Sequence, residues 1–297
     1  MTEKKNYRAK AATGERDKLY PVFPGIWLAF QEVETYSFSP WGKVPSGLLE
    51  ITHCREGRLE YQDSHRAFVL GEGDLSIRQT RKEEAALLCP VKRYRGLSVL
   101  IHPEQAPPCT SCFLRDVNVS LAELYEKFCG EGRPFIMRAT PQLEHIFAQL
   151  YQVPQSIQRG YFKVKVLELL LYLDALELDG RTEKPYFYKS QVEKVKAAHR
   201  LLTEDLERHY TIAELSARFS IPATALKECF KSVYGQPVNT YMRNLRMDRA
   251  ALLLRQEPQT SVAEIAGRVG YDSASKFAAV FREAKGKTPL EYRREGR

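Results

Sequence analysis

The sequence predicts an α+β protein with an N-terminal antiparallel β-barrel, a helical segment after it, and a C-terminal all-α domain in which a long helix joins two helix-turn-helix units. Three observations support this fold class. Short strand-like runs occupy the first third of the chain, helix-forming runs occupy the remainder, and one pattern of about 50 residues occurs twice between Thr211 and Tyr292. The 297 residues are enough for two domains.

The chain begins with a polar, lysine-rich stretch. Residues 1–18 carry six Lys and Arg against three Asp and Glu, so we expect a disordered basic tail or an arm that folds over another part of the protein. No apolar run with a cleavage site follows this stretch. It is therefore not a secretory signal, and we expect a cytoplasmic protein.

Residues 19–118 are predicted to form the barrel. Their strand-like runs are short and separated by turn residues, a spacing typical of a small antiparallel barrel or jelly roll. The runs are Ile26 to Phe38, a hairpin from Leu48 to Gln62 that turns at Glu56 and Gly57, a pair from Ala67 to Leu70 and from Asp74 to Ile77, and Leu97 to Ile101.

The candidate effector pocket is a set of barrel side chains. Trp27, Phe30, Trp41 and Tyr61 supply aromatic surface that either packs in the core or lines a ligand site. His53 is expected to point inward, as a core histidine or as an effector contact. Because the barrel histidines are isolated in the sequence, we predict no metal site and no other cofactor.

The six cysteines are scattered along the chain, which is typical of reduced thiols. Cys109 and Cys112 form one C-x-x-C pair without a second pair nearby, and we interpret them as ordinary loop cysteines.

Residues 119–180 read as a helical segment. Its predicted helices run from Ser120 to Cys129, Pro141 to Tyr151 and Gln155 to Leu178. The third has an apolar face wider than a single stripe, but charged residues interrupt it, so it does not reach the ~20 apolar residues that a membrane span needs. Residues 181–190 have little periodicity and are interpreted as a linker to a domain at 191–297.

The repeated pattern opens each time with the signature of a helix start. Thr211 and Glu214 recur 50 residues later as Ser261 and Glu264, and both pairs have the spacing of a capping box. A turn follows each short helix, at 220–222 and at 270–273, and a second helix then ends at Gly235 or Gly286. Helix, turn and helix is the plan of a helix-turn-helix unit.

The segment between the two units predicts one long helix from Val238 to Gln256, stopped by Pro258. About 19 residues at ~1.5 Å each give a rod of roughly 28 Å. Successive major-groove faces of B-DNA repeat every ~34 Å, so the two second helices are expected to reach adjacent groove segments. Residues 191–297 also hold 19 Lys and Arg against 13 Asp and Glu, which suits phosphate contacts.

From Ile265 to Arg293 the sequence resembles the signature of the AraC/XylS family of transcription regulators, with Gly270, Phe281 and Pro289 at the family's spacing. The resemblance implies two DNA-binding helix-turn-helix units, a cupin-like sensing barrel before them, and a dimerisation helix, although that helix also suits packing within its own domain. The implied partners are double-stranded DNA, a small-molecule effector, a second copy of the chain and RNA polymerase.

The predicted DNA contacts follow from the exposed sides of the second helices. The base contacts are Thr224, Lys227, Glu228, Ser273, Ala274, Ser275 and Lys276. The phosphate contacts are Lys231, Arg246, Arg249, Arg282, Arg293 and Arg294, with packing as the alternative role for the arginines of the connecting helix and of the C-terminus. Glu228 and Ala279 stand where the family usually has Arg, so the preferred base sequence does not follow from the resemblance.

Two other functions stay open. The main interpretation is a regulator controlled by an effector. The first alternative is a DNA-binding regulator whose barrel only dimerises, and the second is a cupin-type enzyme fused to a DNA-binding domain. No Ser-His-Asp set, P-loop or glycine-rich nucleotide motif occurs in the sequence, so we expect no enzymatic activity.

Overall fold

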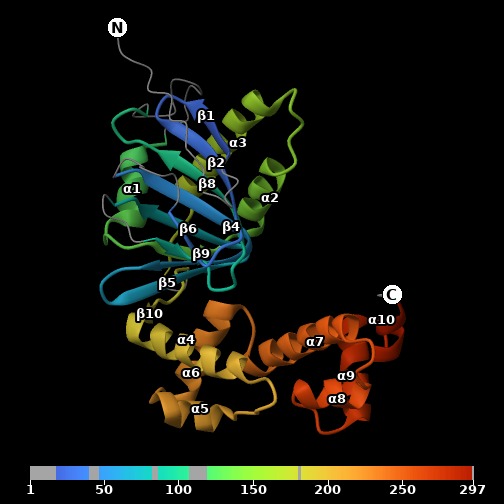
Figure 1. The fold of residues 1–297 in the computed structure, drawn as a ribbon. Helices are drawn as coiled ribbons and strands as arrows, with labels where there is room; N and C mark the ends of the chain where they lie inside the picture. The colour runs from blue at the N-terminus through green and yellow to red at the C-terminus, as the bar shows by residue number, and fades with distance from the viewer. Residues whose placement is uncertain (1–17, 40–46, 82–85, 107–118, 180–181, 296–297) are drawn as a thin grey trace. The chain divides into compact units, whose positions relative to one another are not determined.

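The computed structural model describes residues 18–39, 47–81, 86–106, 119–179 and 182–295. The chain divides into two compact units, Met1–Phe187 and Tyr188–Arg297 (Figure 1). Three predictions lie outside the described residues: the tail up to residue 17, Trp41, and the cysteine pair at Cys109 and Cys112.

The first unit is built on an antiparallel sheet. Its strands are β1 (Lys18–Phe23), β2 (Ile26–Val33), β3 (Ser37–Phe38), β4 (Leu49–Gln62), β5 (Arg66–Gly71), β6 (Asp74–Gln79), β7 (Leu87–Leu88), β8 (Tyr94–Ile101), β9 (Phe135–Arg138) and β10 (Phe187–Tyr188). The strand order is β1-β2-β8-β4-β5-β10, with β6 and β9 beside the first half of β4 and with β3 and β7 beside its second half. The antiparallel sheet is confirmed, and the pairings among the described strands leave it open.

The predicted hairpin from Leu48 to Gln62 is wrong, because β4 is one continuous strand of 14 residues. A bulge between Cys54 and Glu56 bends the strand instead of reversing it. Gly57 has φ +80°, and a Cβ there would lie 1.8 Å from the carbonyl oxygen of Arg93, so only glycine fits this bend. After the bend β4 changes partners, from β6 and β8 to β5.

Three helices cover one face of the sheet, which we call the helix-covered face. They are α1 (Leu121–Cys129), α2 (Pro141–Leu150) and α3 (Gln158–Ala175), and their apolar side chains form one core with alternate residues of β2, β8, β4 and β6 (Figure 1). The first two match the predicted helices. The third is shorter at both ends than predicted, because a turn in which Ile157 N–H bonds the Pro154 carbonyl precedes it and Leu176 is extended.

The segment interpreted as a linker is attached to the sheet in its first half. Lys184 donates its backbone N–H to the Ile136 carbonyl and its ammonium to the Asp74 carboxylate at 2.6 Å. The sequence also gave no sign of β9, which pairs with β6 although it lies between two helices in the chain. In the described part of the chain, no helix has the length and apolar content needed to cross a membrane.

The second unit is all helical. Its helices are α4 (Lys189–Glu204), α5 (Ile212–Phe219), α6 (Ala223–Tyr234), α7 (Val238–Gln256), α8 (Val262–Arg268), α9 (Ala274–Lys285) and α10 (Pro289–Glu295). The long helix α7 has the predicted bounds. Helix α10 was not predicted, although Thr288 accepts from Glu291 N–H in the same cap geometry that marked the other helix starts.

Candidate nucleic-acid interface

The first helix-turn-helix unit consists of α5 and α6. Thr211 accepts from Glu214 N–H at 3.2 Å and the Glu214 carboxylate accepts from Thr211 N–H at 2.7 Å, so the predicted capping box is confirmed. The hydrogen bonds that the Glu214 carboxylate accepts from the Thr211 amide and hydroxyl lower its pKa. Ser220 ends α5 in the left-handed conformation with φ 47°, and the chain then turns through Ile221 into α6. This geometry fixes where the second helix emerges.

The second helix-turn-helix unit, α8 and α9, repeats this plan with one difference at its start. Ser261 accepts from Glu264 N–H at 3.0 Å, but the Glu264 carboxylate accepts from Arg268 at 2.7 Å and not from the Ser261 amide. Only half of the second predicted capping box is therefore present. Gly270 has a left-handed conformation, φ +80°, at the position that Ser220 occupies in the first helix-turn-helix unit.

The second helices present the predicted base-contact residues to solvent. On α6, Thr224, Lys227 and Glu228 are exposed, whereas Leu226 and Phe230 are fully buried beneath them. His199 of α4 stacks on Tyr234 at 4.1 Å between ring centroids, which anchors the far end of α6. The outward face of α6 is thus held by a packed inward face.

Helix α9 is arranged in the same way. Ala274, Ser275 and Lys276 are exposed in its first turn, and Phe277 behind them is fully buried. Ser273 is also exposed, but its hydroxyl accepts from Lys276 N–H at 3.3 Å and so already caps the helix. Ala274, Ser275 and Lys276 are therefore the predicted contacts on α9 that carry no structural role of this kind.

The predicted phosphate contacts fall into two groups. Four are exposed and available at the surface of the second unit: Lys231, Arg249, Arg282 and Arg294. Arg293 is half-buried and donates to the Thr260 carbonyl at 2.7 Å. Arg246 is 7% exposed, and its guanidinium faces the protein interior. For Arg246 this geometry favours packing, the alternative role, over phosphate contact.

Arg246 of α7 holds the segment between α4 and α5 against the turn between α8 and α9. Its guanidinium donates to the carbonyls of Leu206 at 3.0 Å and Arg208 at 3.1 Å, and to His209 Nδ1 at 3.1 Å. With Nδ1 accepting, His209 Nε2 donates to the Gly270 carbonyl at 2.6 Å. Burial lowers the pKa of Arg246. A chain of hydrogen bonds therefore runs from the connecting helix to the turn that positions α9.

Comparison with known proteins agrees with this geometry. The family described as a helix-turn-helix domain matches residues 215–295, and the motif from Ile265 to Arg293 lies within that range. A transcriptional activator, RhaR of Mannheimia succiniciproducens, is 30% identical over 156 residues, which are 51% of this chain and 54% of that protein. Residues 215–295 are similar to the helix-turn-helix domain of AraC-type regulators.

Two solved structures are each similar to about a third of this chain. A transcriptional regulator with an AraC-type DNA-binding domain from Chromobacterium violaceum is 25% identical over 35% of this chain and 92% of its own, with a TM-score of 0.32. The DNA-binding domain of AdpA in complex with a target DNA is 27% identical over 35% of this chain and 91% of its own, also with a TM-score of 0.32. The chain spans about half the length of the curated relatives it matches.

The two positions where the motif departs from the usual arginine of the AraC/XylS family are both at the surface. Glu228 and Ala279 are exposed on α6 and α9. Neither side chain contributes to the core of its helix-turn-helix unit.

The predicted effector residues do not share one cavity. Phe30 and His53 lie on the helix-covered face, where His53 stacks on Phe147 at 4.4 Å and its Nε2 is 3.2 Å from the Glu144 carboxylate. Burial, with Arg138 and Arg55 nearby, lowers the pKa of His53 to about 4. The imidazole is therefore neutral at pH 7, and its contact with Glu144 is not a salt bridge.

The other predicted residues face the opposite side of the sheet. Trp27 packs against the cluster of Ala29, Leu48 and Leu100. Tyr61 is buried in a separate cluster, with the Arg78 guanidinium 4.6 Å from its ring centroid. Of the set, Phe30 and His53 each line a cavity on the helix-covered face, at two different places.

Sequence reasoning missed a buried polar surface on that opposite side. The strand registers align Ser98, Thr52 and Ser76 in one row across β8, β4 and β6, and place the Glu50–Arg78 ion pair in the next row. All five side chains are at most 3% exposed. Alternation of polar and apolar residues in β4 usually signals a solvated face, so the sequence alone could not show that both faces are covered.

Proposed function

We propose that this chain is a sequence-specific DNA-binding transcription regulator that places α6 and α9 in two successive major-groove segments. The observation that carries the proposal is the pair of solvent-facing second helices joined by the 19-residue helix α7. At ~1.5 Å per residue α7 is roughly 28 Å long, close to the ~34 Å repeat of one groove face. The excess of Lys and Arg in residues 191–297 would favour contacts with the phosphates that flank both grooves.

Selection of DNA from a random library by the full chain tests this proposal. We expect an enriched motif with two blocks, and we expect Lys227→Ala to relax the preferred bases in one block only. Lys287→Ala is the matched control, because Lys287 pairs with Glu295 outside the recognition helices. Library recovery without any enriched motif would show that the chain does not read sequence.

We further propose that the first unit is a cupin-like barrel that binds a small-molecule effector. The buried polar surface supports this, because a buried hydroxyl or amide left without a partner costs about 1–3 kcal/mol, whereas a polar ligand would satisfy it. The Gln31 amide nitrogen and the Tyr94 hydroxyl on this side have no hydrogen-bond partner among the described residues. An effector that prefers one arrangement of the two units would shift the population competent for DNA.

A metabolite screen by thermal melting of the full chain tests effector binding. A ligand at 100 times its Kd stabilises the native state by roughly 2.7 kcal/mol, which a melt detects. A hit that also changes operator affinity supports sensing. A hit that leaves operator affinity and transcription unchanged would favour the alternative regulator, whose barrel only dimerises.

The dimer that we propose would form through α3 and its flanking residues. Ile157, Val164 and Leu171 are exposed apolar residues spaced seven apart, at 52%, 61% and 36% exposure. Seven-residue spacing of apolar side chains is the pattern of paired helices. A second copy of the same helix would bury this stripe.

Sedimentation of the full chain tests the dimer. Val164→Glu places a charge in the middle of the stripe and should yield a monomer, whereas Tyr36→Glu, at an exposed aromatic position outside the stripe, should leave the assembly unchanged. A monomeric wild-type chain at all concentrations, or a Val164→Glu variant that still dimerises, would remove α3 as the interface.

A further inference from the structure

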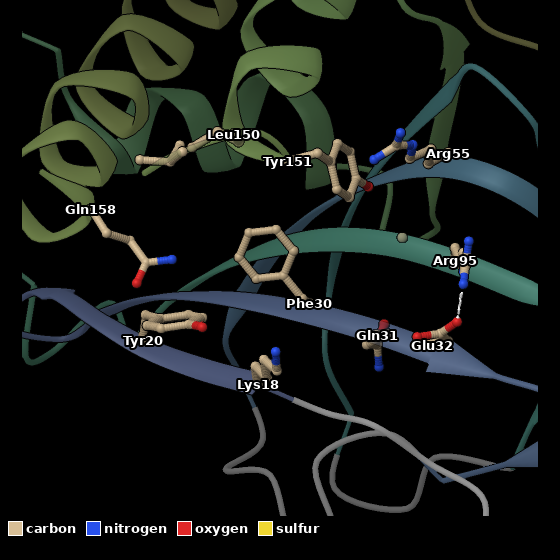
Figure 2. Close-up of a pocket in the computed structure, with 12 residues that line it drawn as sticks. Lys18, Tyr20, Phe30, Gln31, Glu32, Arg55, Arg95, Leu150, Tyr151 and Gln158 are labelled. Atoms are coloured by element: carbon tan, nitrogen blue, oxygen red, sulfur yellow. Dashed lines mark hydrogen bonds and ion pairs between the residues drawn. The ribbon is translucent and has the colours of Figure 1, made fainter. Parts of the chain in front are cut away.

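A cavity of about 340 Å³ lies on the helix-covered face, between the ends of β1, β2 and β8 and the connection from α2 to α3 (Figure 2). It lies across the sheet from the buried polar surface. In Figure 2 the Phe30 ring points from β2 into this space, Tyr20 lies beside it, and Tyr151 and Leu150 face it from the end of α2. Cavities of this size hold small organic molecules.

The apolar part of the cavity is aromatic. Phe30 meets Tyr20 and Tyr151 edge to face, with 5.8 Å between ring centroids in both pairs. Phe162 of α3 supports Tyr20 from behind at 5.2 Å. Phe30 and Tyr151 are only partly buried, so ring surface remains available in the cavity. A flat aromatic group would extend the same edge-to-face packing.

The polar part of the cavity carries an excess of positive charge. Lys18, Arg55 and Arg95 line it together with one carboxylate, Glu32. Arg95 is already engaged, because it donates to Glu32 at 2.7 Å. Neither Lys18 nor Arg55 has a carboxylate partner among the described residues, and the Arg55 guanidinium lies 4.4 Å from the Tyr151 ring centroid.

Two further features of the lining favour an anion. The Tyr151 hydroxyl is buried and has no hydrogen-bond partner among the described residues. The first turn of α3, which contributes Gln158 to the lining, has neither a side-chain cap nor an acidic residue, so its partial positive charge is not neutralised.

We propose that this cavity binds a small aromatic carboxylate, with its ring against Phe30, Tyr20 and Tyr151 and its carboxylate on Arg55. The Tyr151 hydroxyl donates a second hydrogen bond to the same carboxylate. A guanidinium is suited to this role because it binds a carboxylate through parallel donors and stacks on aromatic rings at the same time. The three aromatic rings favour a flat ring over a polyol, and the cavity has too few free cations for a polyphosphate.

This ligand would also connect the cavity to the proposed regulation. The walls come from the sheet on one side and from the α2–α3 connection on the other, and α3 carries the exposed stripe of the proposed dimer. A bound ring would hold that connection against the sheet. The effect on the dimer rests on the proposed function, whereas binding itself does not.

Calorimetric titration of the full chain with phenylacetate tests the site. We expect saturable binding of one molecule per chain. Phenylacetamide, which lacks the charge, and hexanoate, which lacks the ring, should each bind at least about tenfold more weakly. Arg55→Gln should also weaken phenylacetate binding at least about tenfold, whereas Arg81→Gln, an exposed arginine outside the cavity, should leave it unchanged.

Tyr151→Phe is a second variant that keeps the ring and removes only the hydroxyl. It should weaken phenylacetate binding by about threefold to tenfold while leaving hexanoate binding unaffected. Absence of saturable binding, equal affinity for the acid and the amide, or equal loss in Arg55→Gln and Arg81→Gln would each overturn the inference. Because DNA affinity is measured separately without ligand, loss of operator binding would refute the proposed function and leave this site standing.

Discussion

Replacing Arg246 with alanine should destabilise the second unit without removing a phosphate contact. The side chain is 7% exposed on α7, and its guanidinium reaches two backbone carbonyls and one imidazole nitrogen of the segment between α4 and α5. Alanine would leave these three acceptors without their donor, among them the carbonyl of half-buried Leu206. The hydrogen bond from His209 to the Gly270 carbonyl would also lose its support.

The size of the effect follows from these contacts. A hydrogen bond from a charged group contributes about 1.5–3 kcal/mol. Because the three bonds are not additive, we expect a loss of about 3 kcal/mol in the free energy of unfolding. For a domain of this size that corresponds to a melting temperature lower by roughly 12 °C.

Arg243→Ala is the matched control on the same helix. Its guanidinium makes one contact with a described carboxylate, Glu283, at 3.3 Å, and both side chains are largely exposed. Exposed pairs of this kind contribute about 0–1 kcal/mol. The full chain is measured by scanning calorimetry, and hydrogen exchange of the peptides around Leu206 and Gly270 assigns the shifted transition to the second unit.

The salt dependence of DNA affinity can refute the packing role of Arg246. A phosphate contact removed by Arg246→Ala would lower the slope of log affinity against log salt by about one. A lowered slope together with an unchanged melting temperature would show that Arg246 binds DNA and that the packing role derived from the structure is wrong.

Three further predictions concern single side chains of the second unit. Lys227→Ala and Lys276→Ala should each change base preference in a different half of the selected site, because the two residues lie on different second helices. Arg249→Ala should lower the salt slope by about one without changing the selected sequence, because this exposed side chain lies on α7 and not on a second helix. Burial lowers the pKa of His199 from 6.5 to about 4, so the unfolded chain binds a proton in that interval that the folded chain does not, and the stability of the second unit should fall as pH decreases through it.

Each of these predictions has an outcome that contradicts it. Equal weakening of all DNA sequences by both lysine variants would make the lysines phosphate contacts. An altered consensus with an unchanged slope in Arg249→Ala would make that arginine a base contact. A nuclear magnetic resonance titration in which His199 ionises near its ordinary pKa would remove the pH effect.

The helices were largely predictable because their signals are local. Thr211 and Glu214 mark the start of α5, Gly235 marks the end of α6, and Pro258 follows the end of α7. The bend in β4 was not predictable in this way. Gly57 looks like a turn in the sequence, and only its close approach to Arg93 in the folded sheet shows that it continues the strand.

The candidate sites also differ in whether their signals are local in the sequence. Exposure of Lys227 and Lys276 follows from helical spacing next to buried apolar residues, which the sequence contains. The role of Arg246 depends on carbonyls about 40 residues away in the chain, and the cavity around Phe30 depends on where α2 ends over the sheet. Neither the Arg246 hydrogen bonds nor the cavity has a local signal in the sequence. Aromatic content alone therefore grouped Phe30 with Trp27 and Tyr61, which lie on the opposite side of the sheet.

The most direct test of the account is the spacing of the two halves of the selected DNA site. If α6 and α9 occupy successive major grooves, selection by the full chain should return two blocks about 10 base pairs apart, centre to centre. Inserting about five base pairs between them turns one block to the opposite side of the duplex and should reduce affinity to that of a single block. Affinity that does not depend on this spacing, or a motif with only one block that both lysine variants alter in the same way, would contradict the central claim.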